Sequence, residues 1–175
     1  MTSLDPTSWR ACRRAVAVCA AVGYRRLVVP ILLWMVCITV FAASPGVALQ
    51  MVQTQGLGSN FAALATNAAS ASQSYRMMEA RVTAPKAKAL LAEHIQKVLP
   101  KYQPQWDRNL ALSYAEVLSD AEMTSISREG RNSPYAGRLT ASARDVGSRM
   151  QSRSGDLLTK AATEALSAAL AASTP

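Results

Sequence analysis

Few residues of this chain have the types and spacing that catalysis requires. His94 is the only histidine, and a single histidine without cysteines does not make a typical zinc site, which takes three or four N, S or O ligands. Glu122 and Glu129 lie seven residues apart and could perform acid–base chemistry if a pocket raised the pKa of one of them. The simpler interpretation makes Glu122 a helix cap, Glu129 a solvated side chain and His94 a half-buried helix residue beside Glu93.

Other catalytic signatures are missing from the sequence. No serine stands in a G-x-S-x-G context, and the chain has neither a phosphate-binding loop nor a G-x-G-x-x-G motif. We therefore expect a protein that is not an enzyme, and we assign no catalytic, cofactor-binding or metal-binding residue. A hydrolytic enzyme that uses its carboxylates is kept as a third hypothesis.

Positive charge gathers between residues 128 and 153, where six arginines occupy 26 positions with Glu129 and Asp145 among them. Such a region could contact anionic lipid headgroups, an envelope polymer or an acidic protein. Arginines distributed around a solvated helix explain the same pattern. Nucleic acid is not expected, because aromatic residues are scarce in this stretch. The candidate contact residues are Arg128, Arg131, Arg138, Arg144, Arg149 and Arg153.

An uncharged run over residues 27–43 decides the compartment of the protein. The run directly follows Arg25 and Arg26 and has 17 residues. This length is slightly long for the apolar part of a signal peptide and near the lower limit for a membrane-spanning helix. Pro45 and Gly46 would break a helix after the run, and Ala48 ends a small-residue site for cleavage. We predict a signal peptide over residues 1–48, with a retained anchor as the alternative.

Both interpretations keep the arginines in the cytoplasm and move the rest of the chain across the membrane. The expected location is therefore periplasmic or otherwise exported, and in the alternative the protein is anchored in the inner membrane with a cytoplasmic N-terminus. Cys12, Cys19 and Cys37 all precede residue 49, so a cleaved protein has no disulfide. Half of the net charge of +8 lies in residues 1–48, and the remainder of the chain is only mildly basic.

The rest of the chain is predicted to form a single helical domain. Residues 49–74 are low in complexity and predict a linker or a frayed helix, with Gly56 and Gly58 in its first part. Residues 75–172 are rich in alanine and poor in β-branched residues, as in helices. The sequence predicts an all-α fold, a small helical bundle of about four to six helices, preceded by an N-terminal hydrophobic signal or anchor helix.

Proline, glycine and capping residues divide the helical domain into elements. We expect a helix over about 85–99 that ends at Pro100, and another that starts at Pro104. Ser119 and Glu122 form a capping box for a short helix that ends near Gly130. Ser133 and Pro134 then begin a last helix that runs towards residue 172, with a bend or a split at the glycines 147 and 155.

The stretch from Leu118 to Leu139 resembles the family known as domain of unknown function 2059. The matching residues are Ser119 and Glu122 at the start, and Ser133-Pro134 with Gly137 at the end, while Glu129-Gly130 stands in place of the aromatic pair of that family. The resemblance implies a small helical protein exported by Gram-negative bacteria, and it carries no catalytic residue.

These observations lead to one expected function and two alternatives. We expect an exported, non-enzymatic helical protein of the cell envelope with an interaction or accessory role. The alternative is a single-pass anchored protein whose external helical domain contacts lipid or envelope partners, and the third is the hydrolytic enzyme.

Overall fold

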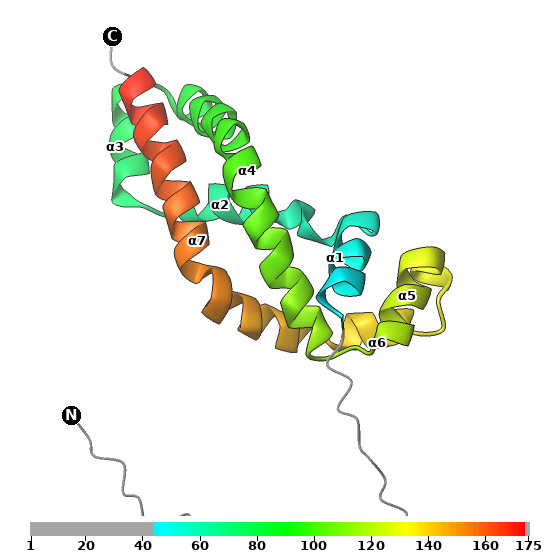
Figure 1. Ribbon diagram of the computed structural model, residues 1–175. Helices are drawn as coiled ribbons and strands as arrows, with labels where there is room; N and C mark the ends of the chain where they lie inside the picture. Colours follow the sequence, from blue (N-terminus) through cyan, green and yellow to red (C-terminus); the bar gives the residue numbers. More distant parts are fainter. Residues whose placement is uncertain (1–43, 174–175) are drawn as a thin grey trace, which may run out of the picture. The chain divides into compact units, whose positions relative to one another are not determined.

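The structure, a computed structural model, describes residues 44–173, and these residues are helical without any strand (Figure 1). The predicted all-α class is thereby confirmed, whereas the predicted signal or anchor helix over residues 27–43 lies outside the described residues. The elements are α1 (Pro45–Thr54), η2 (Leu57–Asn60), α2 (Phe61–Ser70), α3 (Gln73–Arg81), α4 (Ala84–Ala115), α5 (Asp120–Glu129), η3 (Gly130–Asn132), α6 (Ala136–Ala141) and α7 (Ala143–Ala172).

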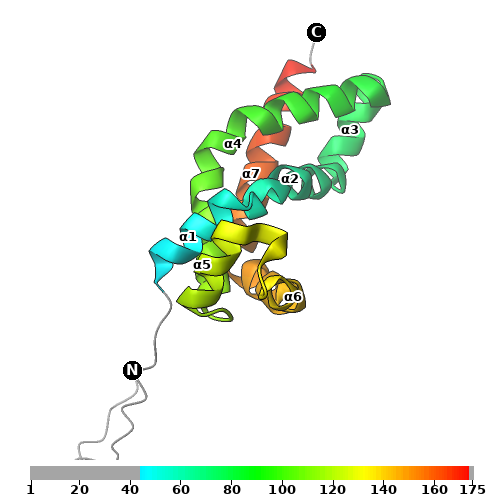
Figure 2. The same ribbon diagram turned by 90° about the vertical axis from the view of Figure 1, so that its right-hand side faces the viewer.

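Two long helices, α4 and α7, pack against each other and carry the other elements (Figures 1 and 2). A first hydrophobic cluster joins α1, α5 and the start of α2 to the C-terminal half of α4 and the N-terminal half of α7. A second cluster joins the rest of α2 and α3 to the opposite halves of the same two helices. Because α4 and α7 contribute to both clusters, these two helices connect the two ends of the domain.

Helix α4 continues through both of its internal prolines, so the predicted break between residues 99 and 104 is wrong. Each proline lacks the N–H that would bond the carbonyl four residues earlier. Pro100 and Pro104 both lie on the exposed face of α4, where water can satisfy those carbonyls. The helix bends instead of ending, as Figure 1 shows.

Residues 49–74 differ from the predicted linker, because they form packed helices of the domain. Helix α1 buries Ala48, Met51 and Val52 completely or nearly so, and α2 buries Phe61 and Ala65. The alanine- and serine-rich composition suggested a solvated segment. Small side chains also let helices approach closely, which is how α2 uses them.

Gly56 and Gly58 have structural roles that a flexible linker would not require. Gly56 adopts the left-handed conformation, with φ of 61°, where α1 turns into η2. At Gly58 a β-carbon would collide with the carboxylate of Asp107 on α4, and the Gly58 carbonyl accepts a hydrogen bond from Gln103 Nε2 at 3.0 Å. Any larger residue at position 58 would therefore displace the Asp107 carboxylate, which accepts a hydrogen bond from Gln103 Nε2 at 2.7 Å.

The C-terminal region contains two helices where one was predicted from Pro134. Ser133 is buried and accepts the N–H of Tyr135 at 3.2 Å in a turn, so it does not cap a helix directly. Helix α6 follows, and Ser142 separates it from α7. Gly147 and Gly155, the expected positions of a bend or split, lie inside α7, which is not split at either glycine but does not run straight (Figure 1).

Candidate functional site

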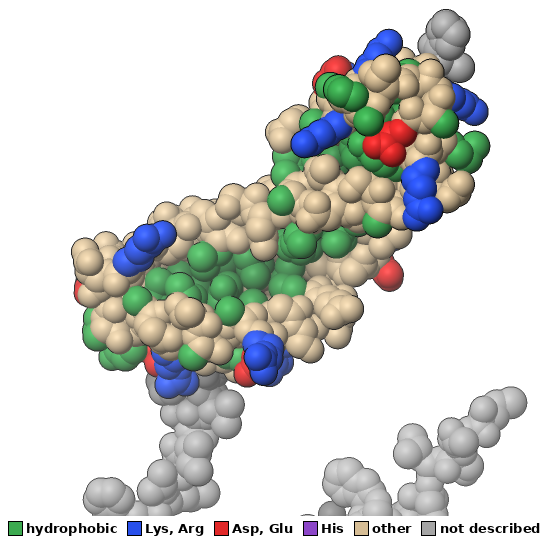
Figure 3. Space-filling view, turned by 180° about the vertical axis from the view of Figure 1, so that it is seen from behind, with side chains coloured by type: hydrophobic (Ala, Val, Ile, Leu, Met, Phe, Trp, Pro, Cys, Tyr) green, Lys and Arg blue, Asp and Glu red, His purple; other side chains and the backbone are tan. Residues whose placement is uncertain are grey.

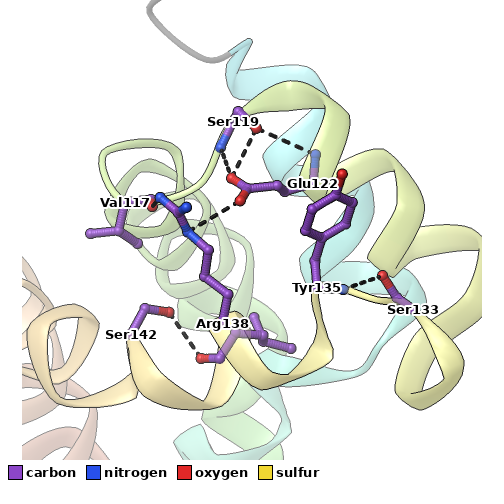
Figure 4. A network of polar contacts seen from close by, with 8 residues as sticks. Val117, Ser119, Glu122, Ser133, Tyr135, Arg138 and Ser142 are labelled. Carbon is purple, nitrogen blue, oxygen red and sulfur yellow. Dashed lines mark hydrogen bonds and ion pairs between the residues drawn. The ribbon is translucent and has the colours of Figure 1, made fainter.

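The capping box predicted at Ser119 and Glu122 is present at the start of α5 (Figure 4). The N–H and the hydroxyl of Ser119 both donate to the Glu122 carboxylate at 2.8 Å, and Ser119 Oγ accepts the Glu122 N–H at 3.5 Å. Arg138 Nε on α6 lies 3.1 Å from the other Glu122 oxygen, and the same guanidinium donates to the carbonyl of Val117 at 3.4 Å. This network connects α6 to both ends of the α4–α5 turn.

The electrostatics of Glu122 fit a structural role. Burial by itself raises the pKa of this carboxyl, but the two Ser119 hydrogen bonds and the Arg138 charge outweigh it and hold the pKa below its ordinary value. Glu122 therefore stays ionised at neutral pH and cannot deliver a proton as a general acid there.

The other candidate catalytic residues are not brought to Glu122. Glu129 is exposed at the far end of α5, about 10 Å along the helix axis from Glu122, where it accepts a hydrogen bond from Ser125 at 3.3 Å. His94 is half-buried on α4 among residues of the second hydrophobic cluster, while the buried residues of α5 belong to the first. These three residues form no shared site.

Half of the six candidate arginines are engaged in ion pairs. Arg138 pairs with Glu122, and Arg149 and Arg153 both pair with Glu116 at the end of α4. Arg128, Arg131 and Arg144 are exposed, and no ion pair involves them within the described part of the chain. The predicted basic contact region is consequently divided into neutralised structural pairs and three separate cations.

A groove with a volume of about 560 Å³ lies between α2, α4 and α7. Figure 3 shows from behind a hollow lined with hydrophobic side chains. The α4 wall contributes Trp106, Leu110 and Tyr114. The face of Trp106 stacks on Phe61 with ring centroids 4.8 Å apart, which fixes the position of this wall. Burial raises the pKa of Tyr114, so its hydroxyl stays neutral.

The opposite wall of the groove is the N-terminal half of α7. It presents Val146, Met150 and Leu158 together with two glycines, Gly147 and Gly155. Within the described part of the chain, no heavy atom outside the helix backbone lies within 4 Å of the position that a β-carbon would take at either glycine. Neither glycine adopts a positive φ. The glycines therefore leave open space on this wall where any other residue would project a side chain.

Polar groups are few in the groove. Leu57 and Leu64 close its third side, next to Asn60, and no charged residue among positions 44–173 lines it. Ser154 is buried and already accepts a hydrogen bond from Asn109 Nδ2 at 2.8 Å. The indole N–H of Trp106 is the one buried side-chain donor without a partner in the part of the chain that the structure describes, a deficit that costs about 1–3 kcal/mol.

The sequence analysis did not predict this groove. Trp106, Leu110 and Tyr114 follow one another at steps of four and share the face of α4 that lines it, but this spacing alone does not separate a packed core from an open groove. The signal that could have found the groove is the pair of mid-helix glycines in α7, which the sequence interpretation assigned to bending. Within residues 44–173 no cluster of metal-ligating side chains occurs, and no helix there is long and apolar enough to span a membrane.

Comparison with protein-family models, with curated proteins and with solved structures gives no match to this chain. The resemblance to the domain of unknown function 2059 family thus rests on the residues of the α5–α6 region alone. Those residues form the capping box and the turn around Ser133.

Proposed function

We propose that this protein is an exported, non-enzymatic helical protein of the cell envelope that acts by binding an apolar ligand in the groove between α2, α4 and α7. Export is supported by the uncharged run over residues 27–43 behind Arg25 and Arg26. Binding is supported by the volume of the groove, which falls in the range of about 300–1,000 Å³ typical of ligand pockets.

The two glycines in the α7 wall carry this proposal. Glycine inside a helix costs about 1 kcal/mol relative to alanine, and at Gly147 and Gly155 neither the backbone conformation nor a neighbouring atom requires it. The residue type at both positions is explained if the space beside α7 has to remain free. A purely structural helix would gain stability from alanine at the same positions.

The domain boundary bears on how export would proceed. The N–H of Ser44 donates to the Asp120 carboxylate at 2.7 Å, and Ala48 is completely buried in α1. Cleavage after Ala48 would remove the first turn of α1 and this core residue. If the signal is removed, we therefore place the cut at or shortly before Ser44, where Ala42 or Ala43 supplies the small residue directly before the cut.

The intact mass of the protein recovered from separate membrane and periplasmic fractions of a Gram-negative host tests export. A periplasmic chain that begins at Ser44 or a few residues earlier supports the proposal, and one that begins at Leu49 would contradict the placement of the cut. A full-length chain in the membrane fraction would favour the anchored alternative. A full-length chain in the cytoplasm would overturn export itself.

Binding is tested with the uncharged dye N-phenyl-1-naphthylamine, whose fluorescence rises in an apolar site. Gly155→Leu places a side chain in the groove from a position where the β-carbon meets no neighbouring atom, and we expect the dye to bind at least about tenfold more weakly, a loss of about 1.4 kcal/mol. Gly137→Leu is the matched control, because Gly137 also has open space around it but does not line the groove. Equal binding by the two variants would contradict the proposal.

A further inference from the structure

We infer that the ligand of the groove is an anionic single-chain lipid, whose acyl chain occupies the groove while its headgroup contacts Arg144. This inference rests on the proposed binding function and adds the chemical class of the ligand. Three features of the described residues support it: the size of the opening, the lack of charge in the lining, and the position of one free cation at the edge of the groove.

The opening of the groove is too small for a protein partner. Its large hydrophobic side chains are buried or half-buried, except Leu64, which is 37% exposed. A stable protein interface buries about 800 Å² on each partner, which one exposed leucine at this rim does not approach. A narrow ligand that enters between the helices fits the volume of about 560 Å³ better than a surface laid across them.

The lining selects an uncharged ligand body. None of the residues around the groove carries a charge, so an ion at its floor would lose its hydration without gaining a partner. The polar side chains available to a ligand are Asn60, Gln151 and the hydroxyl of Tyr114. A hydrocarbon chain satisfies this lining, and any charged group of the ligand has to remain at the rim.

Arg144 stands at that rim on the side of the groove. With 3.6 residues per helical turn, Arg144 projects from α7 between the directions of Gln151 and Gly155, both of which line the groove. Arg149 and Arg153 project from the other side of α7 and pair with Glu116. Arg144 is exposed and, among the described residues, no carboxylate forms an ion pair with it.

Displacement of bound N-phenyl-1-naphthylamine by two lipids with the same palmitoyl chain tests the inference. We expect palmitoyl lysophosphatidylglycerol, which is anionic, to bind about tenfold more tightly than the zwitterionic palmitoyl lysophosphatidylcholine. Arg144→Gln should remove this preference and leave the affinity for the zwitterionic lipid unchanged. Arg131→Gln is the control, because Arg131 is also exposed but belongs to η3 and does not line the groove.

The possible failures separate the two proposals. A wild-type protein that binds the dye but shows no preference for the anionic lipid, or a preference that persists in Arg144→Gln, would overturn the inference and leave the groove function standing. A wild-type protein that does not bind the dye would overturn the groove function as well. Loss of the preference in both arginine variants would also count against Arg144, since it would indicate a diffuse effect of net charge.

Discussion

The two halves of α7 are both rich in small residues, yet they build opposite kinds of surface. In the C-terminal half, Ala165 and Ala169 are completely buried and pack in one cluster with Ala65 and Ala69 of α2. In the N-terminal half, Gly147 and Gly155 face open space. Small side chains bring helices together at one end of the domain and keep a groove open at the other.

The difference lies in what stands opposite each half. At the alanine end, α2 approaches α7 and fills the space that the small side chains leave. At the glycine end, the α4 wall carries the large side chains Trp106 and Tyr114, which hold the helices apart. A helix position occupied by a small residue therefore indicates close packing only where its partner is small as well.

The largest expected effect comes from enlarging a residue at the packed end. Ala165→Leu should lower the free energy of unfolding by about 1–3 kcal/mol, because a completely buried alanine leaves no room for three more carbons. Denaturant unfolding followed by circular dichroism measures the change. An unchanged midpoint would show that the alanine end also has free space, and the contrast between the two halves would be lost.

A second change concerns the polar network that holds α5 at the groove end. Ser119→Ala removes the side-chain cap of α5 and should lower the free energy of unfolding by about 1 kcal/mol. Dye binding should stay within twofold of wild type, on the order of 0.4 kcal/mol, because Ser119 does not line the groove. A large loss of dye affinity at unchanged stability would mean that α5 controls the groove.

The third change, at the groove wall, should stabilise the protein instead of destabilising it. Gly155→Ala should raise the free energy of unfolding by about 0.5–1 kcal/mol, since alanine restricts the unfolded chain and meets no neighbour in the helix. Gly58→Ala is the contrasting variant and should destabilise the protein, because its β-carbon would collide with Asp107. Thermal melts of the two variants, compared with wild type, should move in opposite directions.

Local signals were readable from the sequence, whereas those that depend on a partner helix were not. The capping box at Ser119 and the helix end at Gly130 are set by neighbouring residues, and both were predicted. The effect of Pro100 depended on which face of α4 meets water, and that face is defined only by the packing of α7 and α2. The same holds for residues 49–74, whose alanines and serines have no fixed role until a second helix is placed against them.

The groove escaped prediction for a related reason. A stripe such as Trp106, Leu110 and Tyr114 has the same spacing whether it faces a packed core or an open space. Whether the space is filled depends on the residues of the helix opposite the stripe. For this stripe they include two glycines about 40 positions further along the chain. A glycine in the middle of a helix is therefore worth examining even when the helix continues through it.

The smallest expected effect concerns the pH dependence of stability, which should differ between two glutamates at opposite ends of the domain. Glu122 at the groove end has only 9% of its side chain exposed, whereas Glu164 at the other end, which bonds Lys101 and Tyr102, has 42% exposed. The folded protein holds the pKa of both carboxyls below the ordinary value: for Glu164, hydrogen bonds from Lys101 and Tyr102 are the main cause, and for Glu122 the Ser119 bonds and Arg138 outweigh burial.

A lowered pKa in the folded state means that the unfolded chain takes up the proton first as the pH falls. The stability that each carboxylate contributes is therefore present above about pH 4.3, the ordinary value for glutamate, and is lost below it. Glu122→Gln should flatten the dependence of stability on pH in this range more than Glu164→Gln, because water and salt screen the exposed pair. Urea unfolding between pH 3 and pH 6, with and without added salt, measures both slopes. Equal flattening by the two variants would show that the Glu122 network is no better shielded than an ordinary surface pair, and that α5 is held to the groove end by apolar contacts alone.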